Sequence, residues 1–309
     1  MSRKLRANIF LFVTACIWGS AFVAQSIGMT HIGPFTFTAV RILLAAITLA
    51  PVVLLFGKKT TLDAEIVNDK KTLYTGGICC GTALFFVLAF QQAGLQYTTA
   101  GKAAFITSLY IVIVPVLGLF TRKKPGKIIW LCILIAFTGV YLLCIKEGLS
   151  LNRGDFLMFF SAISCAVHII VIDRFSPKVD SVKMSQIQFF VCSFMSFIPM
   201  LILEKPDISS ILISWQPILY AGALSAGLGY TLQVMAQKDT TPAVTALILS
   251  FESVFAVLFG FLILHESLTK REILGCILMF AAILLAQAPE MPIQNKKKTI
   301  DINKIEGRN

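Results

Sequence analysis

Charged residues are scarce in this 309-residue sequence: Asp, Glu, Lys and Arg make up 14% of it, whereas 57% of the residues are hydrophobic. A single water-soluble core could not enclose so much apolar surface. The alternation of polar and apolar residues that marks a membrane-spanning β-strand is also missing, because the apolar runs are continuous. These absences exclude a soluble domain and a barrel, and they predict an all-α membrane protein.

Patterns that carry catalytic or metal chemistry are missing as well. The sequence has no phosphate-binding Gly-rich loop, no His-Glu-x-x-His and no Gly-x-Ser-x-Gly. Its eight cysteines have no metal-ligand spacing, and all of them fall within apolar runs, where small polarizable side chains pack well. We therefore expect no cofactor, no metal site and no enzymatic activity.

The apolar residues fall into ten runs of about 20 residues, the length at which a helix crosses a bilayer. The runs lie near residues 8–27, 34–56, 73–95, 99–120, 127–145, 154–173, 184–203, 212–236, 242–264 and 270–288. The first run follows basic residues, as in a secretory signal, but further runs of similar length follow, which favours a first transmembrane helix. The sequence thus predicts a polytopic bundle of ten transmembrane helices.

Most of the 27 Lys and Arg residues fall between the runs on one predicted side of the membrane. Cytoplasmic loops retain basic residues, so the net charge of +11 requires no nucleic-acid partner. This distribution predicts a protein of the cell (cytoplasmic) membrane with both termini in the cytoplasm. The expected partners are the lipid bilayer and a small-molecule substrate, and the sequence does not determine an oligomeric state.

The second half of the chain repeats the first, at an offset of 147 residues in the early helices and of 142 later. Equivalent positions include Trp18 and Cys165, Gly19 and Ala166, Arg41 and Gln188, Gln91 and Gln233, and Tyr110 and Glu252. We interpret residues 7–146 as a first repeat, residues 153–289 as a second, and residues 290–309 as a disordered basic cytoplasmic tail. Residues 305–308 of the tail match a protease site common in engineered proteins.

Each repeat contains five predicted helices, and an odd number inverts the second repeat relative to the first. Inverted repeats are a recurring way to build carriers, because exchanging the conformations of two similar halves turns an inward-open cavity into an outward-open one. This organisation favours a transporter that works by alternating access over a channel, a receptor or an intramembrane enzyme.

Several short motifs follow one another in order: Ile-Trp-Gly-Ser-Ala-Phe at 17–22, Arg41 after Pro34, Thr-Ser-Leu at 107–109 with Pro115, Phe-Glu-Ser-Val-Phe-Ala at 251–256, and His-Glu-Ser-Leu-Thr at 265–269 leading to Gly275. As an ordered set they resemble the EamA-type carriers of the drug/metabolite transporter superfamily over about residues 7–288. The resemblance implies ten helices, two EamA repeats and transport of small metabolites, but no particular substrate. Ser253 stands where many relatives have Pro, which argues against a kink there.

Glu252 is the leading candidate for the transport site. An ionised side chain in mid-membrane costs about 2.5 to 3.5 kcal/mol on insertion scales, so it should face protein or a water-filled cavity. Small residues on its helix face, including Thr245 and Ala256, allow it to point inward. It could bind a substrate ammonium group, exchange a proton, or act only as a packing carboxyl. Its counterpart Tyr110 offers a ring and a hydroxyl to the same site.

Arg41 also needs a partner within the membrane, either Glu252 or a substrate carboxylate, which a guanidinium can bind with two hydrogen bonds. Alternatively, its long side chain could extend to the outer interface. His168 shares a helical stripe with Ser161 and Ser164, and it could relay protons or only join helices by hydrogen bonds. Trp18 could form a wall of the binding site.

Gln91 and Gln233 could line the same cavity, and Gln188 stands at the position equivalent to Arg41. A ridge of small residues before Gln233 favours close helix packing as the alternative role. We expect a secondary-active or facilitative transporter that exports small organic metabolites such as amino acids, with proton coupling as one option. The alternatives are a membrane sensor or lipid-handling protein without transport, and an intramembrane enzyme.

Overall fold

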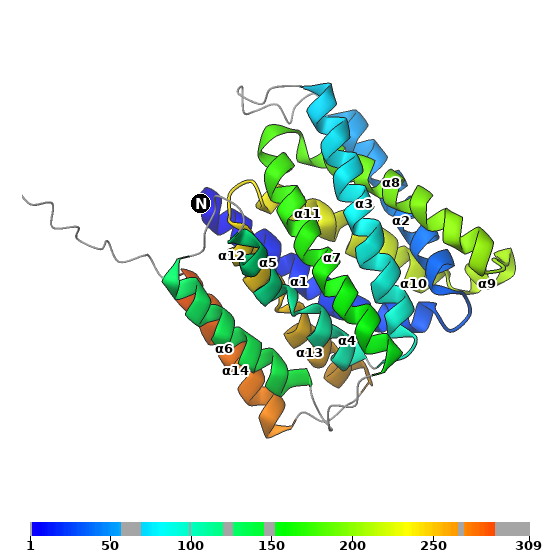
Figure 1. The fold of residues 1–309 in the computed structure, drawn as a ribbon. Helices are drawn as coiled ribbons and strands as arrows, with labels where there is room; N and C mark the ends of the chain where they lie inside the picture. The colour runs from blue at the N-terminus through cyan, green and yellow to red at the C-terminus, as the bar shows by residue number, and fades with distance from the viewer. Residues whose placement is uncertain are drawn as a thin grey trace, which may run out of the picture.

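A computed structural model describes residues 2–56, 69–98, 100–119, 126–144, 152–264 and 269–287. All regular structure within these ranges is helical, and the helices pack into one bundle (Figure 1). The predicted tail, residues 290–309, lies outside the described residues, as does the His-Glu-Ser-Leu part of the last motif.

The first half of the chain forms α1 (Arg3–Gly28), α2 (Pro34–Phe56), α3 (Lys70–Leu95), α4 (Ala100–Thr107), α5 (Tyr110–Gly118) and α6 (Lys127–Cys144). Local signals explain two of the starts. The Ser2 hydroxyl accepts a hydrogen bond from the Leu5 amide, and the Asp69 carboxylate accepts from the amides of Lys71 and Thr72. These helices overlap the first five predicted runs.

The second half forms α7 (Arg153–Phe175), η1 (Ser176–Lys178), α8 (Ser181–Leu203), α9 (Ile208–Ile213), α10 (Trp215–Leu219), η2 (Tyr220–Tyr230), α11 (Thr231–Ala236), α12 (Pro242–Leu249), α13 (Glu252–Leu264) and α14 (Lys270–Gln287). η1 is a 3₁₀-helix and η2 is a π-helix. A capping box of Asn152 and Asp155 starts α7, and Thr241 with Pro242 starts α12. These helices overlap the last five predicted runs.

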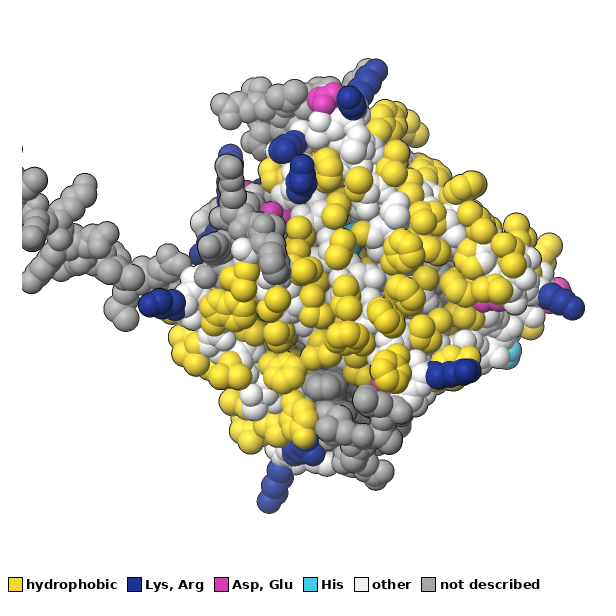
Figure 2. All heavy atoms as spheres, in the orientation of Figure 1, with side chains coloured by type: hydrophobic (Ala, Val, Ile, Leu, Met, Phe, Trp, Pro, Cys, Tyr) yellow, Lys and Arg dark blue, Asp and Glu magenta, His cyan; other side chains and the backbone are white. Residues whose placement is uncertain are grey.

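Seven helices in the described part of the chain are long and apolar enough to cross a membrane. Hydrophobic side chains cover most of the face in Figure 2, and basic side chains gather at its edges. Several of the apolar side chains are largely exposed, including Phe194 at 70% and Ile202 at 74%. An exposed apolar surface of this extent is expected of a protein surrounded by lipid, which agrees with the prediction of a polytopic membrane protein.

Two predicted runs are not single continuous helices. The run over 99–120 is interrupted between α4 and α5, and the run over 242–264 between α12 and α13. At each interruption the backbone tightens to a 3₁₀-type hydrogen bond: the Leu109 amide donates to the Ile106 carbonyl (3.1 Å), and the Phe251 amide to the Ile248 carbonyl (3.2 Å). Ser253, where the sequence argued against a kink, lies within α13, and the break lies just before it, at Ser250 and Phe251, without a proline.

A serine takes part in the second break. The Ser250 hydroxyl donates to the Leu247 carbonyl (2.7 Å) on its own helix. Such a bond competes with the regular helical pattern and commonly accompanies a bend. Ser253 instead points across the bundle, where its hydroxyl lies 2.6 Å from that of Ser108, so the two interrupted helices are joined near their breaks.

Small residues set how closely the helices approach. A Cβ atom added to Gly222 of η2 would lie 2.7 Å from the Arg41 carbonyl oxygen, and one added to Gly229 would lie 2.7 Å from the indole nitrogen of Trp18. Both distances are shorter than side-chain packing allows. The π-helix thus packs directly against α1 and α2, as the predicted small-residue ridge implied.

Candidate functional site

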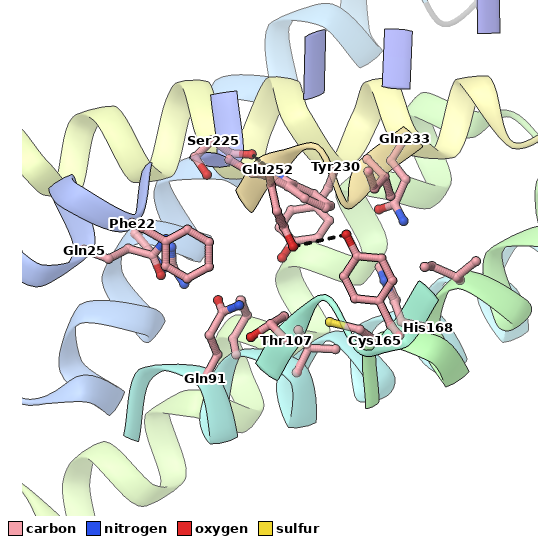
Figure 3. A pocket seen from close by; sticks show the side chains of 17 residues that line it. Phe22, Gln25, Gln91, Thr107, Cys165, His168, Ser225, Tyr230, Gln233 and Glu252 are labelled. Atoms are coloured by element: carbon pink, nitrogen blue, oxygen red, sulfur yellow. Dashed lines mark hydrogen bonds between the residues drawn. The ribbon is translucent and has the colours of Figure 1, made fainter. Parts of the chain in front are cut away.

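A pocket lies where α1, α2, α3, α7, η2 and α11 meet the two interrupted helices. Figure 3 shows the side chains that converge on it. The lining residues are Trp18, Phe22, Gln25, Arg41, Val87, Leu88, Gln91, Thr107, Tyr110, Cys165, His168, Ile169, Ser225, Tyr230, Gln233, Leu249 and Glu252. The pocket therefore combines aromatic and aliphatic walls with a few convergent polar groups, as small-molecule sites do.

Glu252, which Figure 3 labels, and Tyr110 both line this pocket and contact each other. The Tyr110 hydroxyl donates a hydrogen bond to Glu252 Oε1 over 3.1 Å, and both side chains are buried. Each is the first residue of the half-helix that follows a break, α5 for Tyr110 and α13 for Glu252. The interruptions therefore place the two side chains at equivalent points of the pocket.

Tight packing by α1 holds the start of α13 in position. A Cβ atom on Gly19 would lie 2.6 Å from the Glu252 carbonyl oxygen and 2.8 Å from the Ala256 amide nitrogen. Only a glycine allows the two backbones to come this close. Gly19 thus belongs to the support of the site and has no polar role of its own.

Arg41 lies in the pocket wall with 2% of its surface exposed, so it does not extend to the membrane interface. It donates to the side-chain oxygen of Gln92 (3.3 Å), and its guanidinium lies over the Phe37 ring at 5.2 Å. Its Nε has no hydrogen-bond partner. Arg41 does not pair with Glu252, one of the two partners left open by the sequence, and it bonds to the amide of Gln92 on α3 instead. Arg41 therefore carries a buried charge that no described carboxylate neutralises.

Aromatic rings form one wall of the pocket. The rings of Trp18 and Tyr230 lie 4.6 Å apart, and His168 meets Tyr230 edge-on at 5.9 Å. The indole nitrogen of Trp18 donates to the Ser225 carbonyl (3.1 Å), which fixes the ring against η2. The wall offers a planar apolar surface to a bound molecule.

His168 is buried, and its Nε2 lies 3.1 Å from Gln188 Oε1. Gln188 itself lies behind His168 and does not line the pocket. The two serines of the predicted stripe do not line it either: Ser161 donates to the Val87 carbonyl and Ser164 to the Phe160 carbonyl. Of that stripe, only the histidine reaches the pocket.

Three glutamine side chains line the pocket, Gln25 from α1, Gln91 from α3 and Gln233 from α11. The side-chain oxygens of Gln25 and Gln233 are buried without a hydrogen-bond partner. A buried polar atom without a partner costs free energy, so these oxygens are suited to accept hydrogen bonds from a ligand or from water.

The sequence reading gave no role in the site to Tyr230, Ser225, Thr107 or Cys165. Tyr230 follows a small-residue ridge and lies almost one helical turn before Gln233, so its face could have been recognised from the spacing. No sequence signal marks Ser225, which bonds Trp18 through its backbone carbonyl. Within the described residues, no group of His, Cys, Asp and Glu could hold a metal ion.

Comparison with known proteins gives this pocket a context. The EamA-like transporter family model matches the chain twice, over residues 5–145 and 152–287. An uncharacterized transporter of Archaeoglobus fulgidus is 30% identical over 285 residues, covering 92% of this chain and 86% of the relative. The uncharacterized transporter YoaV of Bacillus subtilis is 22% identical, covering 87% and 92%.

The protein PecM of Dickeya dadantii is similar at 22% identity, over 95% of this chain and 96% of its own length. A solved crystal structure matches with a TM-score of 0.73 at 15% sequence identity, covering 91% of this chain and 96% of the other, which shows a shared fold. The matches to the family model extend over nearly all of the described residues. The chain belongs to the EamA-like transporter family.

Proposed function

We propose that the protein is a secondary carrier that moves a small organic metabolite through the pocket by alternating access. The observation that carries the proposal is the composition of the lining. Twelve of the 17 lining residues form pairs at equivalent positions of the two EamA matches. The pairs are Trp18 and Cys165, Phe22 and Ile169, Leu88 and Tyr230, Gln91 and Gln233, Thr107 and Leu249, and Tyr110 and Glu252. A pocket on the axis that relates two halves is where a carrier exposes its substrate to either side.

The helix contacts support ten membrane crossings in two inverted repeats, 7–146 and 153–289. The contact of α3 with α7 has its counterpart in η2 and α11 with α1, and that of α3 with α8 in η2 with α2. The contacts of α1 with α12 and α13 correspond to those of α7 with α4 and α5. The contact of α5 with α12 corresponds to that of α4 with α13, and α2 and α8, as well as α6 and α14, contact their own equivalents. When each helix is exchanged for its equivalent in the other half, every extensive helix–helix contact therefore corresponds to another contact in the structure.

The charges in the pocket favour a substrate that carries both a carboxylate and an ammonium group. Arg41 lacks an anionic partner and Glu252 lacks a cationic one among the described residues, and the two do not pair with each other. Buried charges are stable only when compensated. A zwitterion would compensate both, with its carboxylate at Arg41 and its ammonium at Glu252. Amino acids are therefore the substrate class we propose.

Export is the direction we propose, from a cytoplasmic membrane in which both chain ends face the cytoplasm. The basic residues near the start of α1 and in the loops on the same side support this orientation. A proton on Glu252 could replace the substrate ammonium while the empty carrier returns, because either one neutralises the carboxylate. Proton exchange is thus a coupling route that the pocket allows.

The test is an unbiased exchange screen with purified protein in liposomes, in which amino acids and matched amines and carboxylic acids compete. We expect amino acids to exchange. Glu252→Gln should lower their exchange by about 10- to 150-fold, which corresponds to about 1.5 to 3 kcal/mol for a hydrogen bond to a charged group. Arg41→Gln, which introduces the amide found at the equivalent Gln188, should lower exchange of carboxylates more than that of amines.

Ser164→Ala is the matched control, because Ser164 lies on the stripe of His168 but bonds only within its own helix. It should exchange at the wild-type rate. If the folded wild-type protein exchanges no metabolite, the carrier function is wrong and a sensor or lipid-handling role replaces it. If metabolites exchange but amino acids are not preferred, the carrier function is kept, and the proposed roles of Arg41 and Glu252 in binding a zwitterion are wrong.

A further inference from the structure

Helices α3 and α7 come into backbone contact just beyond the pocket. Gly94 lies almost one turn past the pocket residue Gln91 on α3, and Gly154 lies in the first turn of α7. A Cβ atom on Gly154 would be 2.7 Å from the Gly94 carbonyl oxygen, and one on Gly94 would be 3.0 Å from the Gly154 carbonyl oxygen. No side chain or water fits between backbones this close, so no path to the pocket runs between the two helices at this point.

A polar clasp holds the same end together. The Asn152 side-chain amide donates to the Tyr97 carbonyl (2.9 Å), and the Thr98 hydroxyl donates to Asp155 Oδ1 (3.2 Å). Asp155 Oδ2 also accepts from the Asn152 backbone amide (2.8 Å), and only 2% of Asp155 is exposed. The capping box that starts α7 therefore also binds the segment that follows α3.

The equivalent elements, α1 and α11, close the opposite end with weaker groups. Ala7 and Ala236 stand at the positions of Gly154 and Gly94, and both are buried. Asn8 stands at the position of Asp155, and its side-chain oxygen has no partner. An ion pair joins α1 to the segment after α11 at this end, Arg6 with Asp239 over 3.4 Å, and its side chains are 53% and 20% exposed.

We propose that these two ends are the gates of the carrier, with Asp155 holding the outer gate and the Arg6–Asp239 pair holding the inner gate. The assignment rests on the proposed carrier function and goes beyond it, because it names the residues that decide the side on which the pocket opens. A buried, multiply bonded carboxylate resists opening more than an exposed ion pair, which contributes little. The empty protein therefore opens more readily at the Arg6–Asp239 end, which faces the cytoplasm in the proposed orientation.

Cys165 provides a direct readout, because it lines the pocket midway between the gates. A membrane-impermeant thiol reagent is added to one face of sealed vesicles at a time, and modification of Cys165 is followed by mass spectrometry. In the wild-type protein the cytoplasmic face should label faster. Asp155→Asn should raise labelling from the outer face about tenfold, or about 1.4 kcal/mol, and Asp239→Asn should raise labelling from the inner face about two- to threefold.

Asp155→Asn introduces the residue that the chain already has at the equivalent position, Asn8. If that variant does not fold, Thr98→Val removes the bond across the gate and leaves the capping box intact. Asp180→Asn is the matched control, because Asp180 caps α8 through the amides of Val182 and Lys183 away from both gates. It should change labelling from neither face, and Cys165→Ser should remove the signal.

The gates are supported if the Asp155 and Asp239 variants raise Cys165 labelling from opposite faces of the membrane. This holds even if the Asp155 end turns out to face the cytoplasm. The gates are wrong if either variant changes labelling equally from both faces or not at all, or if Asp180→Asn acts like Asp155→Asn. Metabolite exchange that persists in such a case leaves the carrier function standing. Cys165 that is unreachable from both faces in every variant, together with no exchange of any metabolite, would instead reject the carrier function itself.

Discussion

The two interrupted helices, α4–α5 and α12–α13, have similar backbone geometry but carry different side chains at the break. Each breaks at the same register, and each begins its second half with a buried side chain that reaches the pocket. That side chain is a phenol in one helix and a carboxylate in the other, joined by one hydrogen bond. The comparison teaches that the backbone geometry at these two points is duplicated, whereas the carboxylate is present in one of them only.

Exchanging the two residues tests this comparison with the largest expected effect. Glu252→Tyr and Tyr110→Glu, made separately, should each lower exchange by at least about tenfold, because the pocket then has no carboxylate or two at hydrogen-bond distance. The double variant restores one carboxylate and one phenol at equivalent points. It should recover most of the lost activity in the liposome assay.

Equal loss in the double variant and in Glu252→Tyr would show that the two helices are not interchangeable around the site. Tyr110→Phe serves as the control within the series. It removes only the hydroxyl bond to Glu252 and should lower exchange about two- to tenfold, as for a hydrogen bond of about 0.5 to 1.5 kcal/mol.

The second test compares Gly19 with its counterpart Ala166. A methyl group on Gly19 would clash with the start of α13, whereas Ala166 is buried in α7 with its methyl group accommodated. Gly19→Ala should therefore destabilise the protein by about 1 to 3 kcal/mol, as overpacking does. Ala166→Gly should cost about 1 kcal/mol through the helix propensity of glycine.

Thermal unfolding in detergent would measure both variants under one condition. A Gly19→Ala protein as stable as wild type would mean that α1 can move away from α13 without cost. The close approach of α1 would then not be part of the support for Glu252.

The smallest effect concerns two helix caps, Asp69 at the start of α3 and Asp207 at the start of the short α9, which precedes α10. Hydrogen bonds from Thr72 and from Ser210, respectively, lower the pKa of each carboxyl below its usual value. The ionised caps stabilise the helix starts above the unfolded pKa of about 3.9, and that stabilisation is lost as the pH falls through the lowered folded value.

Hydrogen exchange at acidic pH would follow these caps. The first turns of α3 and α9 should exchange faster, after correction for intrinsic rates, once the pH falls below about 4. The start of α12 is the comparison, because the neutral hydroxyl of Thr241 caps it and does not titrate in this range. Acceleration at α12 as well would indicate general unfolding.

The sequence predicted where the apolar helices lie and seven of the 17 residues that line the pocket, because helical periodicity and the cost of polar groups in a membrane are visible in it. Glu252, Tyr110, Trp18 and Gln91 reach the pocket as their equivalent positions suggested. The partner of Arg41 could not be predicted, since the sequence shows two opposite charges but not that an amide on α3 lies nearer.

The helix breaks and the π-helix could not be predicted from the sequence either. The Ser250 hydroxyl bond and the 3₁₀-type turns arise from competition among near-equal hydrogen bonds, which tertiary packing decides. The segment Tyr220–Tyr230 contains glycines and alanines that permit close packing but do not specify a π-helix over an α-helix. Packing against α1 and α2 makes that choice.

The hydrogen bond between Tyr110 and Glu252 has a consequence for how a molecule sits in the pocket. In the proposed two-repeat arrangement, a cavity with identical side chains at every pair of equivalent positions would accept a ligand equally well in either of two poses, turned end for end. One phenol and one carboxylate help to remove that degeneracy, so the cargo of the proposed carrier would have a defined head and tail. In the proposed exchange of conformations, the same end of the cargo would then lead at every crossing.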